Sequence, residues 1–265
     1  MKILSSANQK GGVLKSTTAL SLAINFSRMG KRVLLIDFDP QHSLSETLIL
    51  SDEDIERKTI FKALLETQGV RDCIEVISPT LHFIPCDLEL EQLPSTLVRL
   101  GRVNQYILLD VLELISGDYD VCIIDCPPNN TFLNTLALSA SNYVIVPTHK
   151  SNWTRKGTEF VLDSIRDMML QKRSHVNIKN VILLPTAINR KRRRLFSDGE
   201  FRKFTDGLHS KFDDGFVRTS SVTIPHDEDA SYLEDIQRDE IPSLNLNILK
   251  IYHDFIVKEN LIHGD

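Results

Sequence analysis

Short apolar runs alternate with longer amphipathic segments along most of the chain. The runs have the length and apolar character of β-strands, and several are apolar throughout, as is typical of strands covered by helices on both faces. They cover Lys2 to Ala7, Arg32 to Asp37, Leu81 to Pro85, Val121 to Asp125, Tyr143 to Pro147, Val181 to Thr186 and Val222 to Pro225.

The segments between these runs predict helices. Ser16 to Met29 has apolar residues at helical spacing and is followed by Gly30, a residue type that commonly ends helices. Further helices are expected near Asn104 to Ile115, Lys156 to Leu170, Phe201 to Lys211 and Leu244 to Lys258, with at least one between Ser51 and Val70. The alternation predicts an α/β fold, a mostly parallel doubly wound sheet of about seven or eight strands with helices on both faces.

Composition narrows the class of protein. The chain has 265 residues, 42% hydrophobic and 25% charged, so we expect a single globular domain over residues 1–265. It shows neither an export signal nor an apolar run that could span a bilayer, which predicts a cytoplasmic protein. The formal net charge of −5 excludes a uniformly basic surface but allows a local basic patch.

Cysteine and histidine spacing gives no reason to expect a transition-metal site. The four cysteines are Cys73, Cys86, Cys122 and Cys126, and none are paired at zinc-binding spacing. We expect them to be reduced thiols that pack as small apolar side chains.

The loop between the first predicted strand and the first predicted helix has the chemistry of a phosphate site. It reads Lys10-Gly11-Gly12-Val13-Leu14-Lys15-Ser16-Thr17. A glycine-rich loop that leads into a helix directs successive backbone N–H groups, and the positive end of the helix, at phosphate oxygens. Lys15 is then placed to reach the β- and γ-phosphates, and the Ser16 hydroxyl to bind Mg²⁺.

The loop departs from the ordinary P-loop pattern, because Gln9 and Leu14 stand where that pattern has glycine. Lys10-Gly11-Gly12 followed by Lys15-Ser16 instead resembles the deviant Walker A loop, which adds a second lysine near its start. The run Asn8 to Thr17 is similar to that of the ParA/Soj family of partition ATPases, a resemblance that implies a P-loop NTPase-like fold.

Two later segments carry the same resemblance in the family's order. Leu34-Leu35-Ile36-Asp37-Phe38-Asp39-Pro40-Gln41 is similar to the family's Asp-x-Asp-Pro-Gln motif, and Ile123-Ile124-Asp125-Cys126-Pro127-Pro128 resembles its Walker B segment. Both place carboxylates at the carboxyl end of a strand, where open α/β sheets bind ligands. Asp125 is suited to hold Mg²⁺ directly or through water.

The resemblance implies roles for these residues and for two more. Residues Lys10 to Thr17 would bind ATP, and Ser16, Asp39 and Asp125 would hold Mg²⁺. Lys10 would reach the nucleotide of a second subunit, so that ATP is sandwiched in a homodimer, while Asp39 positions the attacking water. Asn189 and Pro225 are the candidates for contacts to the base, although asparagine also favours turns.

Leu14 stands immediately before the P-loop lysine, where the family has glycine. If this position requires a positive φ, leucine is disfavoured there by about 1 kcal/mol. The substitution is then a tolerated variation, a cause of slow or absent hydrolysis, or a change that traps one state. We expect ATP binding to survive with weak intrinsic turnover.

A basic run, Arg190-Lys191-Arg192-Arg193-Arg194, stands out in a chain that is acidic overall. Such a run is suited to the phosphate backbone of nonspecific DNA, and it is also compatible with an ordinary solvated surface. The resemblance favours DNA binding by the ATP-bound dimer, association with the nucleoid, and stimulation by a ParB-like centromere-binding partner.

Three alternatives remain open from the sequence. A MinD-like positioning ATPase would need a basic amphipathic helix at the membrane, but the stretch Ile251 to Asn260 is mixed in charge, so we expect no membrane partner. A regulator that binds nucleotide without hydrolysing it is kept open by Leu14. An iron-sulfur relative would need two cysteines at the dimer face, and Cys126 is the one that the motifs place there.

Overall fold

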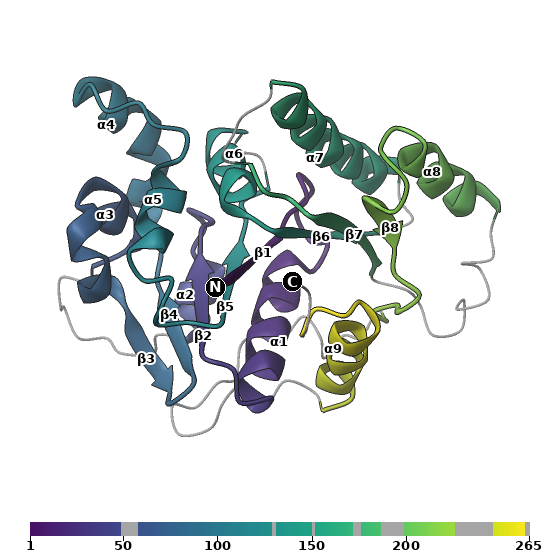
Figure 1. The fold of residues 1–265 in the computed structure, drawn as a ribbon, viewed down its shortest axis with the longest axis horizontal. Helices are drawn as coiled ribbons and strands as arrows, with labels where there is room; N and C mark the ends of the chain where they lie inside the picture. The colour runs from purple at the N-terminus through teal and green to yellow at the C-terminus, as the bar shows by residue number, and fades with distance from the viewer. Residues whose placement is uncertain are drawn as a thin grey trace.

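The strands form one eight-stranded sheet. The computed structural model describes residues 1–48, 58–128, 131–149, 152–171, 176–186, 199–225 and 246–262. Its strands are β1 (Lys2–Ser6), β2 (Val33–Asp37), β3 (Glu75–Ser78), β4 (Leu81–Ile84), β5 (Val121–Asp125), β6 (Tyr143–Thr148), β7 (Asn180–Pro185) and β8 (Val217–Thr219). They lie in the order β3-β4-β2-β5-β1-β6-β7-β8 (Figure 1). Only the edge strand β3 is antiparallel to its neighbour, β4.

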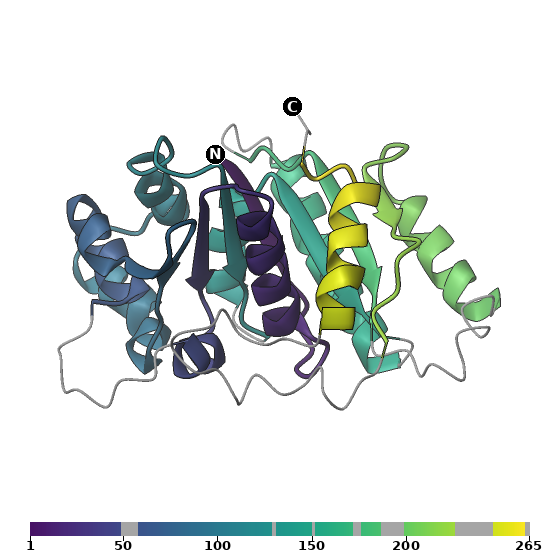
Figure 2. The same ribbon diagram turned by 90° about the horizontal axis from the view of Figure 1, so that it is seen from below.

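Helices cover both faces of this sheet, as the sequence predicts. They are α1 (Lys15–Arg28), α2 (Ser43–Leu48), α3 (Ile60–Leu65), α4 (Leu93–Arg99), α5 (Ile107–Glu113), α6 (Thr131–Ala140), α7 (Asn152–Leu170), α8 (Gly199–His209) and α9 (Leu246–Lys258), with 3₁₀ turns at Thr67–Cys73 and Leu88–Gln92. Helices α1, α2 and α9 share one apolar core with the sheet, and α3 to α8 share the other. Figure 2 shows α1 and α9 side by side on their face.

The first helix ends where its sequence predicts. Gly30 has a φ of +76°, its N–H donates to Ser27 O (2.9 Å), and the N–H of Lys31 donates to Phe26 O (3.1 Å). A left-handed residue that turns the chain in this way ends many helices, and glycine adopts that conformation without a steric cost. The turn leads directly into β2.

The predicted strand over Val222 to Pro225 is wrong. Val222 and Ile224 are buried in the core beside α1 and α9, and the N–H of Ile224 donates to Pro185 O (2.8 Å), but the segment does not form a ladder. Pro225 lacks the N–H that would continue one. The eighth strand is instead β8, which lies a few residues before Val222 in the chain and pairs with β7.

The described helices include none that is both long enough and apolar enough to cross a membrane.

Candidate phosphate and magnesium site

The candidate site lies where three central strands end at the same edge of the sheet. Ser6, at the end of β1, is in register with Asp125 at the end of β5, and Asp125 is in register with Asp37 at the end of β2. From β1 the chain first builds β2 to β4 on one side of the sheet and later β6 to β8 on the other. Doubly wound sheets bind ligands at such a reversal of strand order.

Hydrogen bonds from side chains and from the backbone fix the backbone of the loop between β1 and α1. Thr186 donates its hydroxyl to Val13 O (3.2 Å), Ser6 donates to Lys15 O (3.0 Å), and the first helical bond of α1 runs from Thr18 N–H to Leu14 O (2.9 Å). The N–H groups ahead of Thr18 therefore have no acceptor within the helix, and N–H groups at such a helix start are suited to bind an anion.

The two lysines of the loop have different environments. Lys15 is 7% exposed, and its ammonium folds back to donate to Lys10 O (3.4 Å), so it lies over the loop. Lys10 is exposed. The structure therefore places the Lys15 ammonium over the loop and leaves Lys10 at the surface.

Leu14 adopts the left-handed conformation, with a φ of 70° and a ψ of 33°. The position therefore has the positive φ at which leucine is disfavoured, because L-residues other than glycine avoid this region. The leucine side chain is half-buried and packs against the core formed by α1, α2 and α9. This contact offsets part of the backbone strain.

Asp125 has the features of a cation ligand. It is 1% exposed, and Ser16 hydrogen-bonds to its carboxylate, but its Oδ1 is buried without a donor among the described residues. Burial, followed by the neighbouring charge of Asp37, raises the pKa of Asp125 well above its usual range. A divalent cation would satisfy the orphaned oxygen and favour the ionised carboxylate.

Asp37 and Asp39 lie beside it with different partners. Asp37 is fully buried and accepts from Asp39 N–H (3.1 Å), Ser45 N–H (3.0 Å) and the Ser45 hydroxyl (2.8 Å). Burial raises the pKa of Asp37 to about 6 despite these donors. Asp39 is half-buried and accepts a hydrogen bond from Gln41 N–H (3.1 Å). Burial raises the pKa of Asp39, and the bond from Gln41 and the charge of Lys15 offset part of this rise.

Mg²⁺ fits this set of groups only together with phosphate. Within the described segments, no three His, Cys, Asp or Glu side chains converge as a ready-made metal site. Mg²⁺ is commonly held by one or two carboxylates, water and the phosphates of a substrate. Asp125 and Ser16 match that pattern.

Two of the predicted binding segments fall outside the described residues, namely Asn189 and the basic run Arg190 to Arg194. Pro225 is described and lies at the same edge as the loop. The N–H of Ile224 bonds to Pro185 O, and the next residue in β7, Thr186, bonds to the loop at Val13 O. The structure thus brings Pro225 near the candidate site.

Sequence reasoning missed two residues that support the site. Ser45 donates to Asp37 and accepts from Cys86 N–H (2.8 Å), and Asn8 is 1% exposed beneath the loop. Cys86 therefore lies near this edge as well as Cys126, in contrast to the expectation from the motifs. Burial raises the pKa of both thiols, so both are neutral in the ligand-free protein.

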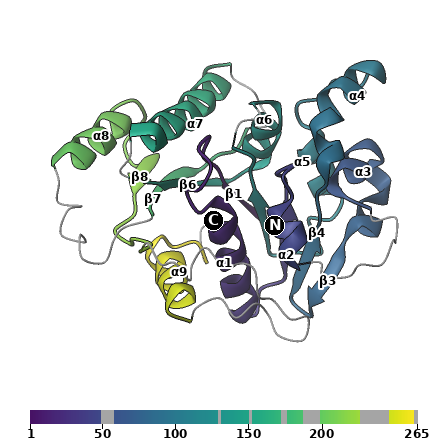
Figure 3. The same cartoon turned by 180° about the vertical axis from the view of Figure 1, so that it is seen from behind.

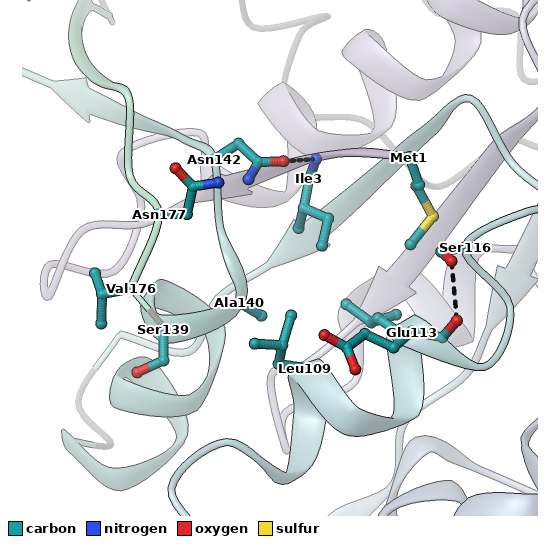
Figure 4. Close-up of a pocket in the computed structure, with 11 residues that line it drawn as sticks. Met1, Ile3, Leu109, Glu113, Ser116, Ser139, Ala140, Asn142, Val176 and Asn177 are labelled. Carbon is teal, nitrogen blue, oxygen red and sulfur yellow. Dashed lines mark hydrogen bonds between the residues drawn. The ribbon is translucent and has the colours of Figure 1, made fainter. Parts of the chain in front are cut away.

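A cavity of about 450 Å³ lies at the opposite edge of the sheet (Figure 4). Its lining includes Met1 and Ile3 at the amino end of β1, where Ile3 N–H donates to Asn142 Oδ1 (2.9 Å). Because the loop follows the carboxyl end of β1, this cavity is not the candidate phosphate site.

The buried carboxylates predict a pH dependence of stability. Because the pKa of Asp37 is about 6 in the fold against 3.8 for an unperturbed carboxyl, the folded state binds more protons between these values. The free energy of unfolding of the ligand-free protein should therefore fall by about 3 kcal/mol from this residue as pH rises from about 4 to about 7. Urea unfolding at a series of pH values measures this change. Asp125→Asn should make the fall of stability with pH shallower, because the pKa of Asp125 is also raised by burial. A free energy of unfolding that rises from pH about 4 to about 7 would contradict the raised pKa of Asp37.

The fold and the site together define a P-loop nucleotide-binding protein of the doubly wound α/β class. The model of a family described as AAA domain matches residues 1–178. The sporulation initiation inhibitor protein Soj of Bacillus subtilis is 33% identical over 190 residues, which cover 69% of this chain and 72% of Soj. The chromosome partitioning protein ParA of Caulobacter vibrioides is 33% identical over 186 residues, 69% of each chain. The chain belongs to the ParA/Soj family of partition ATPases.

Solved structures show the same fold at lower identity. A plasmid partition protein from Borrelia burgdorferi bound to AMPPNP has a TM-score of 0.68 at 24% identity, covering 97% of this chain and 98% of its own. Cobyrinic acid a,c-diamide synthase from Mycobacterium smegmatis, with an ATP analog and magnesium, has a TM-score of 0.74 at 24% identity over 99% and 96%. The P-loop NTPase-like architecture is thereby confirmed.

Proposed function

We propose that this protein is an ATP-dependent dimerising switch that partitions a plasmid or chromosome region. In this proposal the ATP-bound dimer binds nonspecific DNA, and a ParB-like partner stimulates slow hydrolysis. The observation that carries the proposal is the pair of lysines: Lys15 is folded over the phosphate loop, whereas Lys10 is exposed at the rim, free to serve a second subunit.

Each residue of the site then has a separate task. Lys15 and the N–H groups at the start of α1 bind the β- and γ-phosphates. Ser16 and Asp125 would hold Mg²⁺, which neutralises charge on the phosphate oxygens. Asp39 orients the attacking water from its half-buried position, and Lys10 of the second subunit stabilises charge that develops on the transferred phosphoryl group.

An ATPase assay tests this proposal. Turnover should be slow for the protein alone and should rise with nonspecific DNA and with the DNA-binding protein encoded beside it. DNA retention should require ATP and should weaken steeply as salt increases, because it depends on contacts to phosphates. Turnover that neither addition changes would count against partitioning.

The packing of α9 argues against this helix as a membrane-binding element. Leu249, Tyr252 and Phe255 of α9 are buried against the core, and Tyr252 hydrogen-bonds Thr18 of α1 (2.8 Å between the hydroxyl oxygens). A membrane helix must offer its apolar face to lipid. Liposome sedimentation with ATP should therefore recover no more protein than sedimentation without ATP.

Leu14→Gly should be more stable than Leu14→Ala by about 1 kcal/mol. Both substitutions remove the leucine's packing against the core, but only glycine adopts the observed φ of 70° without strain. Because the left-handed conformation is present without nucleotide, the strain lowers the free energy of unfolding, which urea unfolding measures. Gly12 has the same φ and provides the reverse control, because Gly12→Ala should be destabilised. Equal stabilities for Leu14→Gly and Leu14→Ala would show that the left-handed conformation carries no strain.

A further inference from the structure

Helix α7 approaches the phosphate loop more closely than a side chain would allow. A Cβ atom placed on Gly157 would lie 2.3 Å from Asn8 Oδ1 and 3.2 Å from Lys10 N. At every other glycine of the described residues, an added Cβ has nothing within 4 Å. Glycine is unfavourable inside a helix, so its presence here calls for a packing reason. Figure 3 shows α7 on the same side of the sheet as α6, near the loop that follows β1.

Asn8, whose side chain lies against Gly157, links β6, α7 and the phosphate loop. Its amide donates to Pro147 O in β6 (2.9 Å) and to the Thr158 hydroxyl in α7 (3.2 Å). Its Oδ1 accepts from the backbone N–H of Lys10 (2.9 Å). The Thr158 hydroxyl is also hydrogen-bonded to that of Thr148 (3.1 Å). Since Asn8 is 1% exposed, these partners fix its position with little freedom.

We infer that Asn8 and Gly157 form a positioning pair for Lys10. Asn8 fixes the backbone N–H of Lys10 by a hydrogen bond. Gly157 leaves the space that the Asn8 side chain needs to make this bond. The backbone around Lys15 is held separately, by the bonds from Ser6 and Thr186 and by the start of α1. The Lys15 ammonium donates to the carbonyl of Lys10, which is not the group that Asn8 bonds. The inference rests on the proposed role of Lys10 at a second subunit.

The pair predicts a selective defect. In Gly157→Ala the new methyl group displaces the Asn8 side chain, and the hydrogen bond to Lys10 N–H is lost. ATP-dependent dimerisation should weaken by about fivefold or more, as expected for one hydrogen bond. Binding of MgATP to the monomer should stay within about twofold of wild type, because the bonds that hold the backbone around Lys15 are kept. Asn8→Ala should show the same pattern.

The experiment compares Gly157→Ala, Asn8→Ala and the double variant, with Gly207→Ala in α8 as the matched helical control, since an added Cβ at Gly207 meets nothing within 4 Å. Two readouts are used: the amide signal of Lys10 in ¹⁵N-lysine-labelled protein, and the ATP dependence of dimerisation. Both single variants should shift the Lys10 amide signal, and Gly207→Ala should not. The double variant should be no worse than Asn8→Ala, because the colliding oxygen is already gone.

Three results would overturn the inference. These are a Lys10 amide signal that is unchanged in Gly157→Ala, losses that add fully in the double variant, or a Gly157→Ala protein that fails to fold and is not rescued by Asn8→Ala. If wild-type protein does not dimerise with ATP, the proposed function fails. The amide signal then still decides whether Asn8 and Gly157 position Lys10.

Discussion

Lys15→Ala should weaken MgATP binding by about a hundredfold or more. The buried ammonium lies over the loop and supplies the positive charge that phosphates meet there, and charge-assisted hydrogen bonds of this kind contribute about 3 kcal/mol. The loss also removes the lysine whose charge offsets those of Asp39 and Asp125. Titration with a fluorescent ATP analogue measures the change.

Lys10→Ala is the matched control for this prediction, since it removes the other lysine of the same loop. Because Lys10 is exposed, its loss should leave the affinity of the monomer for MgATP nearly unchanged. Lys15→Met, which keeps the length of the side chain, should be as defective as Lys15→Ala. If both Lys15 variants bind MgATP normally, the loop is not the phosphate site.

Asp39→Ala should lower ATP turnover by about a hundredfold to ten-thousandfold while MgATP remains bound. Positioning or deprotonating the attacking water contributes a factor of this size. The Asp39 side chain is half-buried and accepts a hydrogen bond from Gln41 N–H, whereas the backbone bonds of Asp39 to Asp37 and His42 are kept in the alanine variant. Single-turnover assays separate hydrolysis from binding.

Asp214→Ala serves as the control for Asp39→Ala, because Asp214 is exposed just before β8 and lies away from the three strand ends. It should hydrolyse ATP at the wild-type rate. Should Asp39→Ala also turn over normally, the water must be positioned by a group other than Asp39.

The sequence predicted most of the sheet because its central strands are nearly continuous apolar runs. β2, β5 and β6 are buried along their whole length, and such runs are visible without an alignment. β3 escaped prediction because it is a short edge strand whose residues are exposed or half-buried. The prediction of a strand over Val222 to Pro225 was wrong because the apolar residues of this segment pack in the core without forming a strand ladder.

The candidate site was predictable where chemistry depends on local spacing. Lys15, Ser16 and Asp125 belong to motifs that stand at strand ends, and the strand register brings them together. The supporting contacts were not predictable, because Ser45 meets Asp37, and Gly157 meets Asn8, only after the sheet and its helices have packed. The sequence shows that leucine would be strained if this position had a positive φ, but only the folded loop shows that it does.

Sedimentation velocity of Asp39→Ala with ATP, ADP or no nucleotide tests the central claim most directly. We predict a dimer with MgATP and a monomer with ADP or without nucleotide, because in the proposed function Lys10 completes the site of a second subunit only around a γ-phosphate. Adding Lys10→Ala to this variant should abolish the dimer while MgATP still binds. A monomer at saturating MgATP, or a dimer that persists without Lys10, would contradict the account.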